Sequence, residues 1–357
     1  MAQHQVLSER AVSDFPFGEQ TSADSCRISL NRYFWPTVIT GILALALVCV
    51  FMVAPPLKPD RVITYIARSP SGRRLAVGTR NDLIAICDQT KSGSCGIASA
   101  NRGILNDLQF SPDERFLAIA NEDIQFLALE PSENSFLLRA DRQNYGTVRF
   151  NKSGTGLLTI TGRSKIDVIN LETRSTAITI CCSSIYGEVA FGSNGSLIFN
   201  AGHWPRVWDE YGHLVRSLTS DRQEETFRPI AIDQSMRAVF MGSQDGRVYA
   251  WDLKDYKFLM KSHPQDDYVD TIAVLDAIHT VAYCGFGRSL KLWNAVNGAA
   301  SELQKIKPSS NLIALADGHS VVFGINRGTV ETWDLRGAPR LTSTIAAFAS
   351  AKRFSRP

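Results

Sequence analysis

The sequence predicts an all-β domain built from repeated units and preceded by a single transmembrane α-helix. A Trp-Asp pair, or a close variant, recurs at intervals of about 43, 42 and 40 residues. A strand-like segment that enters a turn rich in Ser, Pro, Asp and Gly recurs at the same period. Residues 34–54 carry no charged side chain. As a helix they would extend roughly 31 Å, the thickness of a bilayer core.

The clearest repeat unit is the stretch Gly242 to Asp252, which contains two short strands joined by a tight turn. Asp245 and Gly246 allow the positive φ angles of such a turn, and Val248 to Trp251 is β-branched and aromatic. One hairpin cannot bury its own apolar faces, so it requires neighbouring units.

Seven units can be placed from the two markers. The four clear Trp-Asp positions are Trp208-Asp209, Trp251-Asp252, Trp293-Asn294 and Trp333-Asp334. Degenerate versions stand at Ile86-Cys87, Leu127-Ala128 and Ile169-Asn170. The upstream turns are clearest at Ser69-Pro70, Ser111-Pro112-Asp113, Asn151 to Gly154 and Gly192 to Gly195. Two markers at one period predict a repeat architecture.

These residues resemble the WD40 family of β-propellers. The resemblance covers about residues 60–345 and is closest in the last four units. It implies a seven-bladed WD40-like β-propeller over residues 62–345, with four strands per blade. Little chain lies between the apolar segment and Val62 to donate an extra strand, so we expect the ring to close by packing between blades. The family stabilises each blade with a buried set of Asp, His, Ser or Thr, and Trp. Ser243, Asp245 and Trp251 match three of these positions, and no Gly-His precedes them.

The remaining segments divide by composition. Residues 1–32 predict a mobile polar tail, 33–54 a transmembrane helix, 55–61 a linker and 346–357 a frayed C-terminus. Tyr33, Phe34 and Trp35 suit a membrane interface, and Pro55 and Pro56 end the helix. The apolar segment exceeds a typical signal-peptide core of about 7–15 residues, so we expect an uncleaved anchor.

The side of the membrane that the propeller occupies is open. Counting Arg and Lys beside the span favours the cytoplasm. Long domains translocate largely regardless of charge, and outward-facing propellers are the commoner arrangement for this domain order, so we expect the extracytoplasmic side. Cys87 and Cys95 could form a disulfide in an oxidising compartment. The favoured alternative is that the cysteines are reduced and partly buried.

Signatures of chemistry are missing from the sequence. It has no G-x-S-x-G elbow, H-E-x-x-H, Walker A loop or paired C-x-x-C, and its six histidines lack metal-ligand spacing. We therefore expect no catalytic, cofactor-binding or metal site. A formal net charge of +3 is too small to imply a nucleic-acid partner.

A candidate partner-binding surface lies on the turns that precede the Trp-bearing strands. Five of these turns are mainly basic, and one adds an aromatic side chain. Arginine forks there could bind acidic segments of a protein partner, although surface turns commonly carry charge. The candidate residues are Arg163, Lys165, Trp204, Arg206, Arg247, Arg288 and Arg327.

Two functions compete at this point. The favoured one is a non-catalytic protein–protein interaction scaffold, anchored in a membrane through residues 34–54. The alternative is a propeller enzyme or ligand-binding protein, hydrolase- or lactonase-like, that uses the central channel. Convergence of carboxylates, histidines or a metal on the ring axis would favour the alternative.

Overall fold

The computed structural model describes the chain from residue 62 onward, with short gaps. The described residues are 62–79, 83–90, 94–98, 104–139, 145–162, 164–181, 187–192, 197–203, 205–221, 225–233, 235–325, 328–348 and 352–353. The predicted tail (1–32), transmembrane helix (33–54) and linker (55–61) lie outside them. Within the described ranges, no helix is long and apolar enough to cross a membrane.

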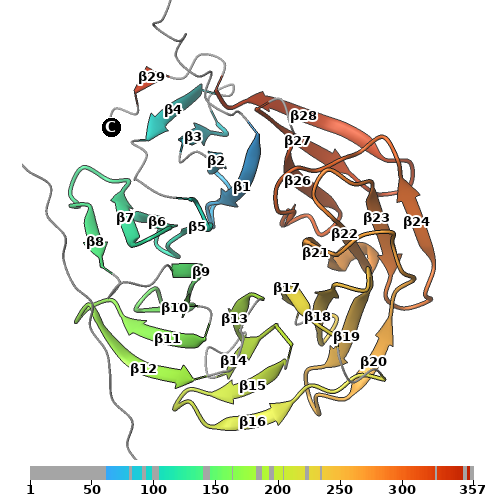
Figure 1. Ribbon diagram of the computed structural model, residues 1–357. Coiled ribbons are helices and arrows are strands. Elements are labelled where there is room, and N and C mark those ends of the chain that lie inside the picture. The colour runs from blue at the N-terminus through green and yellow to red at the C-terminus, as the bar shows by residue number, and fades with distance from the viewer. Residues whose placement is uncertain are drawn as a thin grey trace, which may run out of the picture. The chain divides into compact units, whose positions relative to one another are not determined.

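The described strands form seven antiparallel sheets arranged around a central axis, as the sequence predicts (Figure 1). Blade 1 contains β1 (Ile63–Arg68), β2 (Arg74–Thr79), β3 (Ile84–Asp88) and β4 (Ser94–Ala98). Blade 2 contains β5 (Asp107–Phe110), β6 (Phe116–Ala120), β7 (Ile124–Ala128) and β8 (Phe136–Leu138). Blade 3 contains β9 (Tyr145–Phe150), β10 (Gly156–Thr161), β11 (Lys165–Asn170) and β12 (Ser175–Cys181).

The remaining blades repeat this order from the axis outward. Blade 4 contains β13 (Val189–Phe191), β14 (Leu197–Asn200), β15 (Arg206–Asp209) and β16 (Leu214–Ser217). Blade 5 contains β17 (Phe227–Asp233), β18 (Ala238–Ser243), β19 (Val248–Asp252) and β20 (Phe258–Lys261). Blade 6 contains β21 (Thr271–Leu275), the 3₁₀ turn η1 (Asp276–Ile278), β22 (Thr280–Cys284), β23 (Leu290–Asn294) and β24 (Ala300–Leu303). Blade 7 contains β25 (Ile313–Ala314), β26 (Ser320–Ile325), β27 (Thr329–Asp334) and β28 (Arg340–Ala346).

Strand register explains why the degenerate units still form blades. The third-strand Trp of each clear unit lies opposite a β-branched residue of the second strand: Ile198↔Trp208, Val239↔Trp251, Val281↔Trp293 and Val321↔Trp333. The same position of blades 1 to 3 pairs Leu75↔Cys87, Leu117↔Leu127 and Leu157↔Ile169. A smaller apolar residue therefore replaces Trp without moving the register.

The hydrophobic core is divided among the interfaces between blades. Each of seven buried clusters joins two neighbouring blades, and one of them joins blade 7 to blade 1. In that cluster Ile63 and Val77 of blade 1 pack with Val322 and Val330 of blade 7. The predicted closure by packing between blades is therefore present.

The C-terminal segment differs from the frayed end predicted for 346–357. Ala347 is 0% and Phe348 7% exposed, and both belong to the cluster between blades 7 and 1. Beyond them, β29 (Lys352–Arg353) pairs in parallel with β4, with Lys352 opposite Gly96 and Arg353 opposite Ile97. Burial of these apolar side chains and strand pairing hold the segment against blade 1.

A cross-strand disulfide joins Cys87 of β3 to Cys95 of β4. The preferred expectation of reduced cysteines is therefore wrong for this pair. The bridge occupies the third-strand position that Trp fills in the last four blades. It fixes the outer strand of blade 1, on which β29 pairs.

Phe348→Ala should test whether the chain end is part of the core. Removing a buried Phe side chain leaves a cavity and should lower the free energy of unfolding by about 3–5 kcal/mol. Urea denaturation of the full chain in detergent measures it. Val296→Ala, at a side chain that is 68% exposed, is the control. Equal urea midpoints for the two variants would show that Phe348 contributes nothing to the packing between blades 7 and 1.

Candidate functional site

One face of the ring collects the features that a partner or ligand could contact. Each inner strand begins at this face, and the antiparallel order returns the turn between second and third strands to it. We call it the mouth face. The turns between third and fourth strands lie on the opposite face. Four residues of the sequence-predicted binding surface belong to mouth-face turns or to the strand starts beside them, namely Lys165, Arg206, Arg247 and Arg288.

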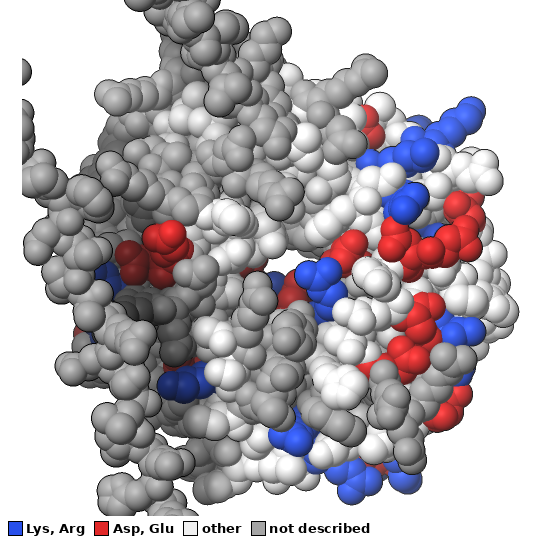
Figure 2. All heavy atoms as spheres, viewed as in Figure 1, with Lys and Arg blue, Asp and Glu red and all other residues white. Residues whose placement is uncertain are grey.

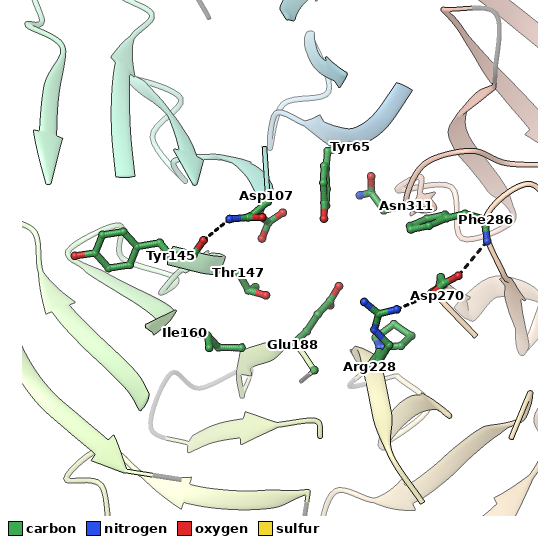
Figure 3. A pocket seen from close by; sticks show the side chains of 14 residues that line it. Tyr65, Asp107, Tyr145, Thr147, Ile160, Glu188, Arg228, Asp270, Phe286 and Asn311 are labelled. Carbon is green, nitrogen blue, oxygen red and sulfur yellow. Dashed lines mark hydrogen bonds and ion pairs between the residues drawn. The ribbon is translucent and has the colours of Figure 1, made fainter. Parts of the chain in front are cut away.

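A cavity of about 280 Å³ opens at the mouth end of the ring axis, and side chains of all seven blades line it (Figure 3). One polar position recurs around its wall at spacings of 40–42 residues, at or near the start of each inner strand. Its occupants are Tyr65, Asp107, Thr147, Glu188, Arg228, Asp270 and Asn311. The cavity wall is therefore a repeat feature, like the core.

Two of these residues connect neighbouring blades. The Asn311 side chain accepts a hydrogen bond from the backbone N–H of Ile66 (2.8 Å) and donates to its carbonyl oxygen (3.0 Å). Asp107 accepts from the backbone N–H of Val148 on blade 3 (3.0 Å) and from its own neighbour Leu108 (2.9 Å). Both side chains satisfy backbone groups of an inner strand that the sheet leaves unpaired.

Asp107 also forms an ion pair with Arg149, whose guanidinium lies 3.5 Å from Glu188 Oε2. The side chains are 9%, 26% and 36% exposed for Asp107, Arg149 and Glu188. Burial opposes ionisation of Arg149, but the two carboxylates raise its pKa above the ordinary value. Burial raises the pKa of Glu188, with a further contribution from Asp107, against the lowering effect of Arg149.

A second ion pair lies across the cavity. Arg228 donates from Nη1 to Asp270 Oδ1 at 3.0 Å, and the backbone N–H of Phe286 donates to Asp270 Oδ2 at 3.2 Å. Arg228 keeps 51% of its side chain exposed. Asp270, at 19%, is held by both donors.

Tyr65 directs its hydroxyl toward the centre of the cavity (Figure 3). Burial raises its pKa, and Asp107 and Glu188 raise it further because a phenolate would face two carboxylates. The phenol therefore stays protonated and remains a hydrogen-bond donor.

The predicted basic surface is only partly available. Arg247 pairs with Asp245 at 2.9 Å and is 21% exposed, and Arg288 pairs with Asp267 at 2.8 Å. Lys165 is exposed, and Arg206 lies over the ring of Trp208, 5.7 Å from its centroid. Figure 2 shows one face of the ring, on which basic and acidic side chains are interspersed. Arg163, Trp204 and Arg327 lie outside the described residues.

Blade 5 replaces the expected buried set of the WD40 family with its own network. Trp251 Nε1 donates to the carbonyl oxygen of Thr219 at 2.9 Å, not to Ser243. Ser243 Oγ donates to Glu225 Oε2 at 2.9 Å. Asp245 accepts from Tyr249 (2.8 Å) and from Arg247.

Sequence reasoning missed the cavity residues because it examined the turns and not the strand starts. The signal was present, since the same period of about 40 residues that locates the Trp positions also locates this polar position. Among the described residues, no group of three or more His, Cys, Asp and Glu side chains could hold a metal ion.

The blade order, register and central channel define a seven-bladed β-propeller, and known proteins that resemble the chain include WD40 propellers. The crystal structure of the WD40 β-propeller domain of Doa1 superposes with a TM-score of 0.66 at 13% identity, covering 78% of this chain and 94% of that one. Protein LST8 homolog from Drosophila pseudoobscura pseudoobscura is 22% identical over 158 residues, which is 43% of this chain. The match covers 50% of that relative's length. No protein-family model matches the chain.

Asp245→Asn should weaken the blade 5 network in a pH-dependent way. Burial opposes ionisation of Asp245, but hydrogen bonds from Tyr249 and Arg247 outweigh it and lower the pKa. The carboxylate's contribution is complete above the unfolded Asp pKa of about 3.9 and is lost as pH falls through the lower folded value. We expect a loss of about 1–3 kcal/mol at pH 7 that shrinks at more acidic pH.

Urea denaturation at pH 7 and at pH values below the unfolded Asp pKa measures this difference. Asp266→Asn, at an exposed carboxylate, is the matched control. A difference between variant and wild type that stays constant with pH would contradict the assigned network.

Proposed function

We propose that this protein is a non-catalytic scaffold, tethered to a membrane, that binds a protein partner on the mouth face. The observation that carries the proposal is a pair of exposed aromatic side chains on the mouth face, of which Phe286 lines the cavity and Tyr268 lies on the loop that touches the Phe286 turn. Tyr268 is 51% and Phe286 45% exposed. Large aromatic side chains on a surface are typical anchors of protein interfaces.

The two aromatic residues lie on segments that hold each other in place. Arg288 Nε donates to Asp267 Oδ2 at 2.8 Å, which joins the turn of Phe286 to the loop of Tyr268. A Cβ atom on Gly285 would lie 2.8 Å from the carbonyl oxygen of Tyr268, so the two backbones touch. The Phe286 N–H is bound to Asp270. Aromatic groups on a preorganised rim lose little freedom on binding.

An acidic segment of the partner would find Lys165 and Arg206 on the same face. Arg247 and Arg288 already pair with carboxylates, so their contribution to acidic recognition is reduced. The enzyme alternative has less support, because Asp107 and Asp270 are bound by arginines and backbone amides.

Alanine at both Tyr268 and Phe286 should strongly weaken partner binding. Proximity labelling or crosslinking in native membranes would measure partner recovery for three proteins. They are the wild type, this aromatic double variant, and a basic double variant that combines Lys165→Ala and Arg206→Ala. We expect about tenfold or greater loss of partner recovery for the aromatic variant, because removing a central anchor costs about 2 kcal/mol or more. The basic variant should lose less.

The matched control is Tyr211→Ala with Val296→Ala. These side chains are 71% and 68% exposed and lie on turns of the opposite face. If the control and the aromatic variant recovered the same partners equally well, the partner would not bind at the mouth face.

We infer that residues 34–54 anchor the propeller on the extracytoplasmic side of the membrane. Support comes from the uncharged length of this segment and from the Cys87–Cys95 disulfide, since disulfides persist in oxidising compartments. A tether also raises the local concentration of the propeller toward membrane partners.

Topology can be tested with sealed vesicles of known orientation. Full-length protein should resist carbonate extraction, and protease should digest the propeller only from the extracytoplasmic side. A thiol-reactive polyethylene glycol should label Cys87 and Cys95 only after reduction, with Cys87→Ser plus Cys95→Ser as the control. Digestion from the cytoplasmic side would reverse the assignment, as would more labelling without reductant than the Cys87→Ser plus Cys95→Ser control shows, since that control retains the exposed free thiol of Cys181.

A further inference from the structure

The polar wall of the cavity contains more charge than the joining of blades requires. Asp107 and Asn311 are accounted for by their hydrogen bonds to inner strands, and Asp270 by Arg228 and the Phe286 N–H. The Tyr65 hydroxyl remains, together with the exposed parts of the Glu188 carboxylate and the Arg228 guanidinium.

The hydrogen-bonding capacity of these three groups is only partly used. Tyr65 makes no side-chain hydrogen bond within the described part of the chain. Glu188 approaches Arg149 at 3.5 Å and receives a hydrogen bond from the backbone of Ile230, yet 36% of its side chain stays exposed. Arg228 uses Nη1 for Asp270 and is 51% exposed. Polar groups that line a cavity without full pairing are candidates for ligand recognition.

The three groups converge on one space. Glu188 and Arg228 belong to adjacent blades, and the backbone N–H of Glu188 donates to the carbonyl oxygen of Arg228 at 2.8 Å. Their side chains extend toward the middle of the cavity, where the Tyr65 hydroxyl faces them from blade 1 (Figure 3). A negative group, a positive group and a neutral donor therefore border the same volume.

We propose that this cavity binds a small zwitterion, with a free α-amino acid as the simplest member of the class. The ligand ammonium group would lie against Glu188, and its carboxylate would accept from Arg228 and from the Tyr65 hydroxyl. Charge-assisted hydrogen bonds to both ends would fix its orientation. The inference does not depend on docking of a protein partner at the rim.

The size and charge of the cavity agree with this class. The volume of about 280 Å³ lies just below the roughly 300–1,000 Å³ of drug-sized ligand sites, which fits a small metabolite. Asp107, Glu188 and Asp270 face Arg149 and Arg228, so the charges nearly balance. A purely anionic ligand would meet the exposed carboxylate of Glu188, and a purely cationic one would leave the free donors of Arg228 unused. The raised pKa of Glu188 also fits a carboxyl group that gains from an incoming ammonium group.

Binding can be measured by calorimetry and by thermal shift on the full chain in detergent. The probes are the twenty amino acids, each at about 10 mM, which would saturate a site with a 1 mM dissociation constant. For each amino acid that binds, the amide lacks the carboxylate and the N-acetyl derivative lacks the ammonium group. We expect both derivatives to bind at least about tenfold more weakly.

Glu188→Gln and Arg228→Gln should each weaken binding by about tenfold or more, and Tyr65→Phe by a smaller factor. Glu172→Gln and Arg340→Gln, at exposed positions away from the cavity, should leave affinity unchanged. Circular dichroism checks folding of each variant. Arg228→Lys keeps the charge and offers a second test if Arg228→Gln does not fold.

Each contrary result overturns a defined part of the inference. Binding of the amide as tightly as the free amino acid removes Arg228 from the site, and tight binding of the N-acetyl derivative removes Glu188. Unchanged affinity in both charge variants places the ligand elsewhere. If none of the twenty amino acids binds, the proposed ligand class is wrong. This result would leave the proposed partner-binding face untouched, because that face is tested separately by partner recovery with the Tyr268 and Phe286 variants.

Discussion

The fold depends on one constraint: a four-stranded blade cannot bury both of its faces alone. Each face must pack against a neighbour, so stability exists only when the last blade reaches the first. The seven clusters satisfy this condition, since each joins two adjacent blades. The interface of blades 7 and 1 additionally receives Ala347, Phe348 and the strand β29. The interface between blades 7 and 1 therefore contains chain segments from outside the repeats in addition to the blades themselves.

The same constraint produces the functional geometry. Inner strands of neighbouring blades cannot pair with each other along their length, so side chains such as Asn311 and Asp107 satisfy their backbone groups. That requirement keeps one position polar in every blade. Some of these residues, including Glu188 and Arg228, also keep part of their charged side chains exposed in the cavity, where a ligand could contact them.

The sequence was sufficient for the architecture because packing and register repeat. Trp251 and Trp293 could be located by spacing, and Leu127 and Ile169 could be inferred at the same positions because an apolar side chain in the correct register is enough. The chain end was not predictable in this way, since Phe348 belongs to no repeat and its burial depends on a surface 280 residues earlier in the chain. The disulfide depends on strand pairing and on the redox compartment, and only the first can be inferred from spacing.

The candidate site was harder to predict than the fold. The turns contain many charges, but the structure shows that Arg247 and Arg288 are neutralised by Asp245 and Asp267. Such pairing is decided by side-chain geometry that a one-dimensional pattern does not contain. The cavity residues, by contrast, were accessible to repeat arithmetic once the position of each inner strand was known, because each blade contributes one of them at an equivalent point.

The connection of the chain at β1 has a mechanical consequence. The first described strand, β1, is the innermost strand of blade 1, and its side chains pack on β26 of blade 7. Tension transmitted from the N-terminal side thus reaches the ring at its axis, next to the junction of first and last blades. The Cys87–Cys95 bridge and β29 reinforce the outer part of the same blade. A pulling force applied at the N-terminal side would accordingly act on the interface between blades 7 and 1 before it acted on the interfaces between other blades.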